Sequence, residues 1–197
     1  MIFADPDGAT PISPEERDEL IPDHITTREQ LNEWEHANIL EAQEWAFDWK
    51  HDDVLSVSFL RELHRRMFGE TWEWAGQFRT TEKNIGVAPH RITEELVNVC
   101  RNTEHWIEHD VFPVPEAAAR YHHELVSVHP FPNGNGRHAR LAADVLLDRM
   151  GYPRFDWGTR QELYDDSDRR TRYIEALRQA DDGDYGPLFE FLGVGGE

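Results

Sequence analysis

The chain has 197 residues, which fits one domain large enough to bury most of its apolar surface around a single core. Its 20 Lys and Arg residues against 39 Asp and Glu residues give a formal net charge of −19, which argues against a nucleic-acid backbone or an anionic membrane as the main partner. The start of the chain lacks a basic stretch followed by an apolar one, and no apolar run approaches the roughly 20 residues of a membrane span, so we expect a cytoplasmic protein.

Helix-start signals appear early in the chain. Ser13, followed by a proline and two glutamates, predicts a first short helix. Thr26 and Thr27 each open a capping box, and apolar residues at helical spacing then run to about Trp49. We therefore expect an N-terminal helical extension over about residues 13–31, ahead of the body of the domain.

Further helices are predicted wherever apolar residues recur at helical spacing. These segments are 59–67 before Gly69, 92–107, 115–128, 135–150, 168–180 and 187–192. Residues 72–90 have no helical period, but the short stretches 77–80 and 85–87 flank polar residues as the two strands of a hairpin would. The sequence therefore predicts an all-α bundle with one short β-hairpin, in a single domain over residues 1–197 whose first 11 and last five residues are loosely held.

Three residue types could suggest additional sites. Cys100 cannot form an internal disulfide because the chain has one cysteine, and its apolar helical setting predicts a buried spectator. Tryptophans near helix ends are expected in the core rather than in a ligand cage, and these are Trp72, Trp74, Trp106 and Trp157. A zinc site is not favoured, because no acid or cysteine at ligand spacing accompanies the histidines His122, His123, His129 and His138.

The stretch from His129 to Arg140 concentrates the most chemistry, and it reads His-Pro-Phe-Pro-Asn-Gly-Asn-Gly-Arg-His-Ala-Arg between two predicted helices. Gly134 and Gly136 let the backbone turn and approach a ligand, so that N–H groups at the start of the second helix converge on an anion. Arg137 and Arg140 lie one helical turn apart, which suits a polyphosphate. A histidine, with an ordinary pKa of about 6.5, can take a proton from an attacking hydroxyl. The alternative is a glycine-rich turn with solvated arginines and a core histidine.

This stretch resembles the signature of the Fic (Fido) family of nucleotidyltransferases, His-x-Phe-x-(Asp or Glu)-Gly-Asn-Gly-Arg-x-x-Arg. Seven of its eight specified positions are identical here, and Asn133 stands at the acidic one. Residues 74–86 resemble the β-hairpin flap of the family, and residues 173–177 resemble its late core helix. The resemblance covers about residues 32–192, and the chain as a whole is most similar to the short bacterial Fic proteins labelled "mobile mystery protein B".

The resemblance implies a Fic-type helical bundle that acts as a protein adenylyltransferase. Such an enzyme transfers AMP from ATP to a Ser, Thr or Tyr hydroxyl of a target protein, and pyrophosphate leaves. Carried over residue by residue, it implies a catalytic base at His129, a loop anchor at Phe131, a magnesium ligand at Asn133, and nucleotide-binding groups at Gly134, Asn135, Gly136, Arg137 and Arg140. Gly-Asn-Gly at residues 134–136 matches the branch of the family that transfers AMP rather than phosphate.

The resemblance also implies target docking and regulation. The flap would dock the target by strand addition through Thr80, Thr81, Glu82, Lys83, Asn84, Ile85 and Gly86. Many Fic enzymes carry a helix glutamate that pairs with the second arginine of the signature and blocks the γ-phosphate. Glu35 stands at about the right place for this role, opposite Arg140, although its neighbours Leu31 and His36 depart from the family pattern. If Glu35 is a solvated helix residue, inhibition falls to a separate regulatory partner protein or is absent.

Asn133 keeps a different function open. An amide supplies an oxygen but no charge, and a hard dication loses attraction when a carboxylate is missing. The alternative is therefore a non-catalytic or phosphotransferring nucleotide-binding module of the same fold. The retained histidine argues for catalysis, because a protein that only binds nucleotide has no need of a base. A histidine-metal nuclease is disfavoured by the charge of −19.

Overall fold

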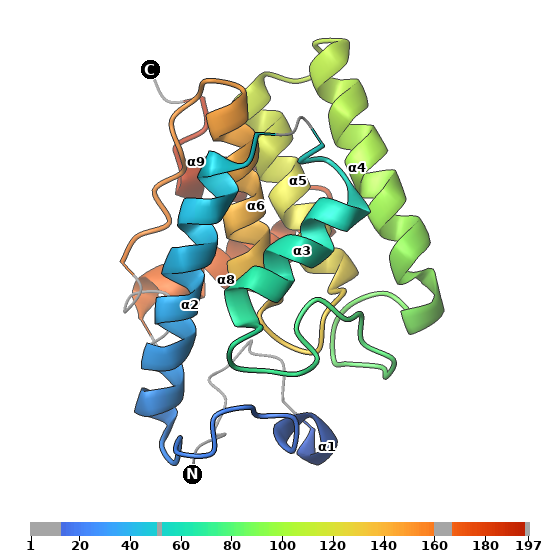
Figure 1. Ribbon diagram of the computed structural model, residues 1–197. Helices are drawn as coiled ribbons and strands as arrows, with labels where there is room; N and C mark the ends of the chain where they lie inside the picture. The colour runs from blue at the N-terminus through green and yellow to red at the C-terminus, as the bar shows by residue number, and fades with distance from the viewer. Residues whose placement is uncertain (1–12, 51–52, 160–166, 196–197) are drawn as a thin grey trace.

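The computed structural model describes residues 13–50, 53–159 and 167–195, and within them it is a bundle of α-helices (Figure 1). The elements are α1 (Pro14–Arg17), α2 (Arg28–Asp48), α3 (Val57–Phe68), the 3-10 turn η1 (Pro89–Arg91), α4 (Ile92–Glu108), α5 (Val114–Val128), α6 (Asn135–Arg149), α8 (Asp168–Asp181) and α9 (Gly186–Leu192). The expected loose start, residues 1–11, lies outside the described residues. Of the expected loose end, residues 193–195 are described, and there the N–H of Val194 donates to the carbonyl of Phe189 at 2.9 Å.

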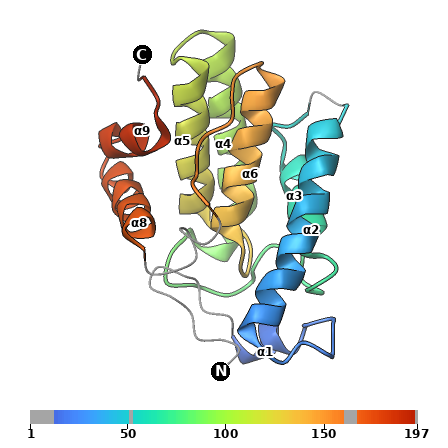
Figure 2. The same cartoon turned by 90° about the vertical axis from the view of Figure 1, so that its left-hand side faces the viewer.

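Helices α5 and α6 pack against each other at the centre of the bundle, and the others surround them (Figures 1 and 2). Helix α4 lies along α5, the pair α2 and α3 packs on α6, and the pair α8 and α9 covers α5. Small side chains let the two central helices approach closely, since Ala117, Ala118 and Ala119 on α5 are fully buried, as are Ala139 and Ala143 on α6. The predicted all-α bundle is confirmed. No helix among the described residues is long and apolar enough to cross a membrane.

Local capping explains why the predicted helix boundaries agree with the structure. Ser13 caps α1 in a capping box with Glu16, and Thr27, rather than Thr26, caps α2 with Gln30. Gly69 ends α3, as the sequence predicts. The N-terminal extension is less helical than expected, because α1 has only four residues.

The buried interior confirms the predictions for cysteine and most tryptophans. Trp72, Trp74 and Trp157 belong to the core, whereas Trp106 is half-buried. Cys100 is buried, and burial raises the pKa of its thiol to about 12. A thiol so far from ionisation is a poor nucleophile, so Cys100 contributes packing rather than chemistry.

The predicted β-hairpin over residues 77–87 is wrong. Among the described residues no strand forms there, and the isolated bridge between Leu20 and Trp72 lies outside it. This flap segment (residues 77–87) pairs instead with the end of α5 and the loop after it: the N–H of Arg79 donates to the carbonyl of Pro130 at 3.0 Å, and that of Val87 donates to the carbonyl of Val128 at 3.3 Å. The guanidinium of Arg79 lies inside the bend and donates to the carbonyls of Thr81 and Val87. In a hairpin, carbonyls of this segment would accept from backbone N–H groups of the opposite strand.

Residues 16–21 pack against the loop of residues 71–83. Lys83 in the flap segment forms a partly buried ion pair with Glu16 of α1 at 2.7 Å, and the indole of Trp74 donates to the carbonyl of Glu16 at 3.2 Å. Backbone bonds from Ile21 to Thr71 and from Glu73 to Glu19 continue the contact. As a result α1, the flap segment and the α5–α6 loop gather at one end of the bundle (Figures 1 and 2).

Candidate functional site

The loop between α5 and α6 is closed by one side chain. The amide of Asn135 accepts a hydrogen bond from the N–H of Phe131 at 2.9 Å and donates one to the carbonyl of Phe131 at 2.8 Å. Asn135, which the sequence predicts as a phosphate ligand, therefore uses its buried side chain to brace the loop. As the first residue of α6, it still places its backbone N–H on the first turn of that helix.

Phe131 anchors the loop to the core. Its ring is fully buried and stacks on His64, with ring centroids 3.7 Å apart and an angle of 17° between the planes. Phe78 of the flap segment and His138 of α6 pack around it, at centroid distances of 5.6 and 5.0 Å. These contacts support the anchoring role that the resemblance implies for Phe131.

His64 is a residue of the site that the sequence reading missed. The N–H of Gly76 donates to its Nδ1 at 3.0 Å, so the neutral ring carries its proton on Nε2, which faces the carbonyl of Asn133 at 3.0 Å. Burial lowers the pKa of His64 well below its ordinary value and keeps this tautomer neutral. One signal existed in the sequence: His64 lies four residues after Leu60 and three before Met67, on the buried face of α3.

His129 ends α5 in a left-handed backbone conformation, with φ 52° and ψ 59°. The residue is only 4% exposed. Burial, and next the positive charge of Arg79, lower the pKa of His129 to about 4. The imidazole is therefore neutral near pH 7 and able to accept a proton.

The start of α6 forms the other side of the loop. Gly134 is its N-cap, with φ 78°, and no side chain caps the first turn. A helix N-terminus without such a cap presents backbone N–H groups and the positive end of the helix dipole to an anion. The predicted phosphate cradle over residues 134–136 thus coincides with a helix start that lacks a side-chain cap.

The two signature arginines have different surroundings. Arg137 donates from Nη1 to Glu35 at 2.5 Å and from Nη2 to Oδ1 of Asn133 at 3.2 Å, and its guanidinium lies 4.6 Å from the ring centre of Phe68. Arg140 lies over the ring of Tyr173 from α8, at 5.7 Å. The two guanidiniums therefore contact opposite sides of the bundle, α2 and α3 for the first and α8 for the second.

Glu35 reaches the loop, but not the arginine that the sequence predicts. Its Oε2 pairs with Arg137 rather than Arg140, and its Oε1 accepts from the indole of Trp72 at 2.8 Å. Helix α2 packs on the α3 side of α6, where Arg137 lies, whereas Arg140 faces α8 one turn later. Glu35 is buried, so the alternative of a solvated helix residue is also wrong.

The residues present fit a magnesium ion only if ATP supplies most of its ligands. Among the described residues, no group of three or more His, Cys, Asp or Glu side chains could hold a metal. The amide oxygen of Asn133 accepts a hydrogen bond from the cationic Arg137. Magnesium commonly takes one or two protein oxygens together with substrate phosphates and water. Asn133 could serve as that single oxygen once a triphosphate attracts Arg137.

The predicted docking residues are mostly exposed. Six of the seven from residue 80 to residue 86 are open to solvent, and Lys83 is half-buried against Glu16. Gly86 has φ 105°, and a Cβ added to it would come within 2.6 Å of both Arg79 and His129. The flap segment thus offers a free outer side while its inner side contacts the candidate base.

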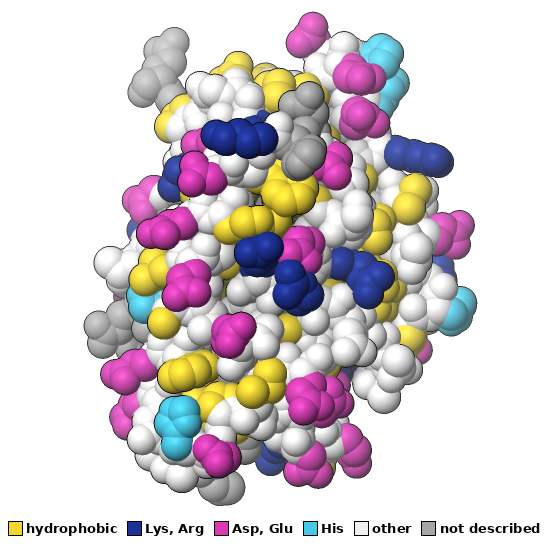
Figure 3. Space-filling model, in the orientation of Figure 1, with side chains coloured by type: hydrophobic (Ala, Val, Ile, Leu, Met, Phe, Trp, Pro, Cys, Tyr) yellow, Lys and Arg dark blue, Asp and Glu magenta, His cyan; other side chains and the backbone are white. Residues whose placement is uncertain are grey.

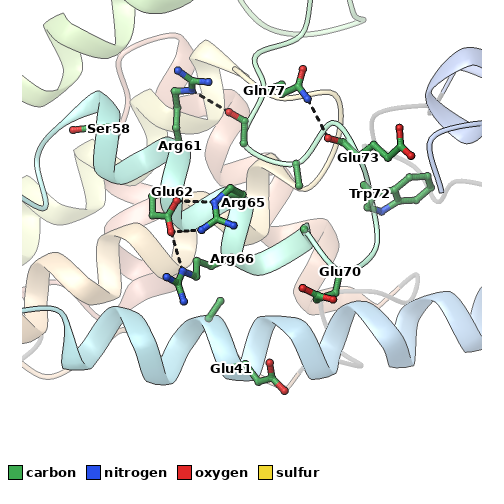
Figure 4. Close-up of a pocket in the computed structure, with 14 residues that line it drawn as sticks. Glu41, Ser58, Arg61, Glu62, Arg65, Arg66, Glu70, Trp72, Glu73 and Gln77 are labelled. Atoms are coloured by element: carbon green, nitrogen blue, oxygen red, sulfur yellow. Dashed lines mark hydrogen bonds and ion pairs between the residues drawn. The ribbon is translucent and has the colours of Figure 1, made fainter. Parts of the chain in front are cut away.

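A separate polar cavity of about 930 Å³ lies between α2, α3 and residues 69–77 (Figure 4). Arg65 and Arg66 both donate to Glu62, and Arg61 donates to the carbonyl of Gly76 at 3.0 Å. Figure 3 shows Lys and Arg side chains gathered near the middle of this face, with acidic side chains around them. None of the predicted site residues lines the cavity, so a molecule bound in it would not contact the α5–α6 loop directly.

Comparisons with known proteins agree with the signature. Residues 54–147 match the Fic/DOC family model. The protein adenylyltransferase Fic of Drosophila grimshawi is 32% identical over 143 residues, which cover 70% of this chain and 28% of that protein. The chain therefore spans little more than a quarter of the length of this relative.

Solved structures share the fold. Fic-1 from C. elegans (residues 134–508) superimposes with a TM-score of 0.67 and 27% identity, covering 89% of this chain and 51% of that one. The BepC protein from Bartonella tribocorum, solved with bound AMPPNP, has a TM-score of 0.69 and 19% identity, and covers 92% of this chain and 98% of that one. The latter likeness concerns the fold alone.

Gly134→Ala should destabilise the protein by about 2 kcal/mol or more. The alanine would adopt an unfavourable positive φ, and its Cβ would come within 2.6 Å of the Phe68 ring. Gly136→Ala is the matched control, because its nearest contact is the end of the Arg140 side chain at 3.6 Å, and it should change stability by less than about 1 kcal/mol. Urea unfolding of both variants measures the difference, and equal effects would contradict the described packing of Gly134.

Proposed function

The chain carries a Fic/DOC family domain, and from this premise we propose that it transfers AMP from ATP to a hydroxyl side chain of a target protein. One observation carries the proposal: the short α5–α6 loop holds a neutral histidine at one end and a helix start without a side-chain cap, followed by two arginines, at the other. The similarity to a protein named as an adenylyltransferase supports the same reaction.

His129 acts as the base in the proposed reaction. It accepts the proton of the target hydroxyl while the hydroxyl oxygen attacks the α-phosphorus of ATP. The bond between that phosphorus and the bridging oxygen breaks, and pyrophosphate leaves with the electron pair. The low pKa of His129 makes it a weak base, so positioning and charge neutralisation carry most of the rate.

The start of α6 binds the nucleotide in this proposal. Backbone N–H groups at residues 134–136 hold the α-phosphate, and Arg137 and Arg140 hold the phosphates beyond it. Asn133 would contribute one oxygen to a magnesium ion arriving with ATP, which would supply further charge neutralisation. BepC, which has the same fold, was solved with bound AMPPNP.

The exposed side of the flap segment docks the target, in our proposal, through the backbone of residues 80–86. Backbone docking demands little particular sequence of the target, and its modified residue can be Ser, Thr or Tyr. From the signature and its flanking segments we also propose that the chain is most like the short bacterial "mobile mystery protein B" proteins. The relatives quoted above come from a fruit fly, a nematode and Bartonella.

His129→Ala should lower AMP transfer by on the order of 100-fold or more, because the base is lost, while ATP affinity stays within a few-fold. The assay incubates parent and variant with α-labelled or γ-labelled ATP and a cell extract, and measures label on protein. His90→Ala, at an exposed position, is the control and should behave as the parent. Parent labelling from γ-labelled ATP alone would favour phosphate transfer, and no labelling from either would favour a binding module.

Regulation through Glu35 follows from its contacts. In our proposal the phosphates of ATP must displace Glu35 from Arg137, and the indole of Trp72 holds the carboxylate in place against them. A partly buried, charge-assisted pair of this kind opposes nucleotide binding directly. A separate regulatory partner protein could act on the same pair by moving α2.

Glu35→Gln should raise ATP affinity by about tenfold or more. The amide oxygen can still accept from Trp72, but the charge that opposes the phosphates is gone, and a hydrogen bond to a charged group is worth about 1.5 to 3 kcal/mol. Calorimetric titration of ATP measures the change. Glu33→Gln removes an exposed charge from the same helix and should have little effect. Equal affinities of the Glu35 variant and the parent would show that this pair does not restrain the site.

Arg140→Ala should weaken ATP binding about tenfold and AMP binding far less, if Arg140 meets the far end of the triphosphate. The figure corresponds to the low end of the range for a charged hydrogen bond, because Arg140 is partly exposed. The same titration, run with both nucleotides, separates the cases. Equal losses for ATP and AMP would reverse the proposed direction of the nucleotide along the loop.

A further inference from the structure

Arg79 is a buried cation whose hydrogen bonds converge on the end of α5. This residue of the flap segment is 3% exposed. Nε donates to the carbonyl of His129 at 2.6 Å, Nη1 to that of Thr81 at 3.0 Å, and Nη2 to those of Val87 and Val128. Each acceptor is a backbone carbonyl, so the guanidinium joins two separate parts of the backbone.

The carbonyls of Val128 and His129 explain why a cation is stable there. They belong to the last turn of α5, where the helix dipole is negative and the final carbonyls lack helical partners. A buried charge is strongly unfavourable unless such groups surround it. Arg79 therefore acts as a cap for the C-terminus of α5, supplied from a segment about 50 residues away in the chain.

His129 needs such a cap because of its conformation. A left-handed backbone is unfavourable for an ordinary residue, and helices that end this way usually have glycine at that place. Here a histidine occupies it, with φ 52°. The bond from Arg79 to the carbonyl of His129 holds the strained peptide, and with it the direction of the imidazole.

Gly86 gives independent evidence that this contact is closely packed. A Cβ at this glycine would lie 2.6 Å from Nη2 of Arg79, 2.6 Å from Cβ of His129 and 3.1 Å from the carbonyl oxygen of Val128. Its φ of 105° also favours glycine. The flap backbone thus approaches Arg79 and His129 as closely as a residue without a side chain allows.

We propose that Arg79 is the positioning residue of the candidate base: its guanidinium fixes the left-handed turn at His129 and so sets the imidazole at the mouth of the site. The inference rests on the proposed function, in which His129 is the base. Arg79 also gives the flap segment a second role. Its side chain holds both the segment proposed to dock the target and His129, which accepts the target's proton.

The charge of Arg79 acts on the same ring. Among the described residues, the charged groups that lower the pKa of His129 are Arg79 and Lys83, and Glu16 of α1 pairs with Lys83. Burial is the largest cause and remains when Arg79 is replaced. Loss of the guanidinium should therefore raise the pKa of His129 from about 4 toward its ordinary value.

Two substitutions separate geometry from charge. Arg79→Met removes both, whereas Arg79→Lys keeps the charge but cannot reach all four carbonyls. NMR titration of the histidine rings, with His129 assigned from the His129→Ala variant, gives the pKa without any need for activity. The pH profile of AMP transfer, calorimetry with ATP and thermal unfolding complete the set. Arg101→Met, at an exposed position on α4, is the matched control and should match the parent throughout.

In Arg79→Met we expect the pKa of His129 to rise and the acidic limb of the pH–rate profile to move to higher pH by the same amount. The maximal rate of AMP transfer should fall at least tenfold, while ATP affinity stays within about twofold of the parent. Arg79→Lys should keep the low pKa and still lose rate. If Arg79→Met does not fold, the rates and His129 titrations of Arg79→Lys and Gly86→Ala provide the test. Gly86→Ala is suitable because its Cβ would displace Arg79 and His129.

A folded Arg79 variant with the parent rate and an unchanged His129 titration would overturn the proposal. A lower rate in Arg79→Met with an unchanged His129 pKa and an unchanged pH profile of AMP transfer would also overturn the proposal, because Arg79 would then have only a structural role. If the parent itself transfers no label, the proposed function fails, and the NMR titration still decides whether Arg79 controls His129.

Discussion

The double hydrogen bond between Asn135 and the backbone of Phe131 is the constraint on which the rest of the site depends. It closes the loop between the two central helices and thereby places the end of α5 and the start of α6 next to each other. One end brings a histidine in a left-handed turn, and the other brings a helix start without a side-chain cap. Without these two hydrogen bonds the loop would lose the contact that ties its middle to the start of α6.

Three segments remote in sequence hold this loop from outside. His64 of α3 contacts the loop by stacking on Phe131 and by a hydrogen bond to the carbonyl of Asn133. Glu35 of α2 holds Arg137, and Arg79 holds the turn at His129. Each of these side chains is buried and polar, and each also forms hydrogen bonds beyond the loop and its flanks: His64 with Gly76, Glu35 with Trp72, and Arg79 with Thr81 and Val87. Buried polar groups that are fully satisfied specify one arrangement strongly, because any slippage leaves one of them without a partner.

The sequence predicts the helices well because their signals are local. The capping boxes at Ser13 and Thr27 and the stop at Gly69 each lie within a few residues of the helix end that they determine. The chemistry of the α5–α6 loop is likewise readable, since its residues are contiguous. The predicted hairpin failed for the opposite reason. Two short stretches that flank polar residues suggest the strands of a hairpin, but the partner that satisfies the backbone N–H of Arg79 lies at residue 130.

The partner of Glu35 and the role of His64 also depend on packing. Whether Glu35 meets Arg137 or Arg140 is decided by which side of α6 faces α2, and nothing near Glu35 in the sequence records that choice. His64 looks like any histidine on a buried helix face until Gly76, twelve residues later, fixes its tautomer. Long-range hydrogen bonds of this kind are outside the reach of periodicity and capping signals.

The strongly acidic composition has a consequence for kinetics. A chain of net charge −19 repels a polyanion such as ATP over distances comparable with the Debye length, and the arginines of the loop attract it only at close range. The long-range field therefore slows the approach of nucleotide, and dissolved salt screens that field before it weakens the partly buried contacts inside the site. Nucleotide should thus associate faster at physiological ionic strength than in dilute buffer, the reverse of the behaviour of an electrostatically steered enzyme.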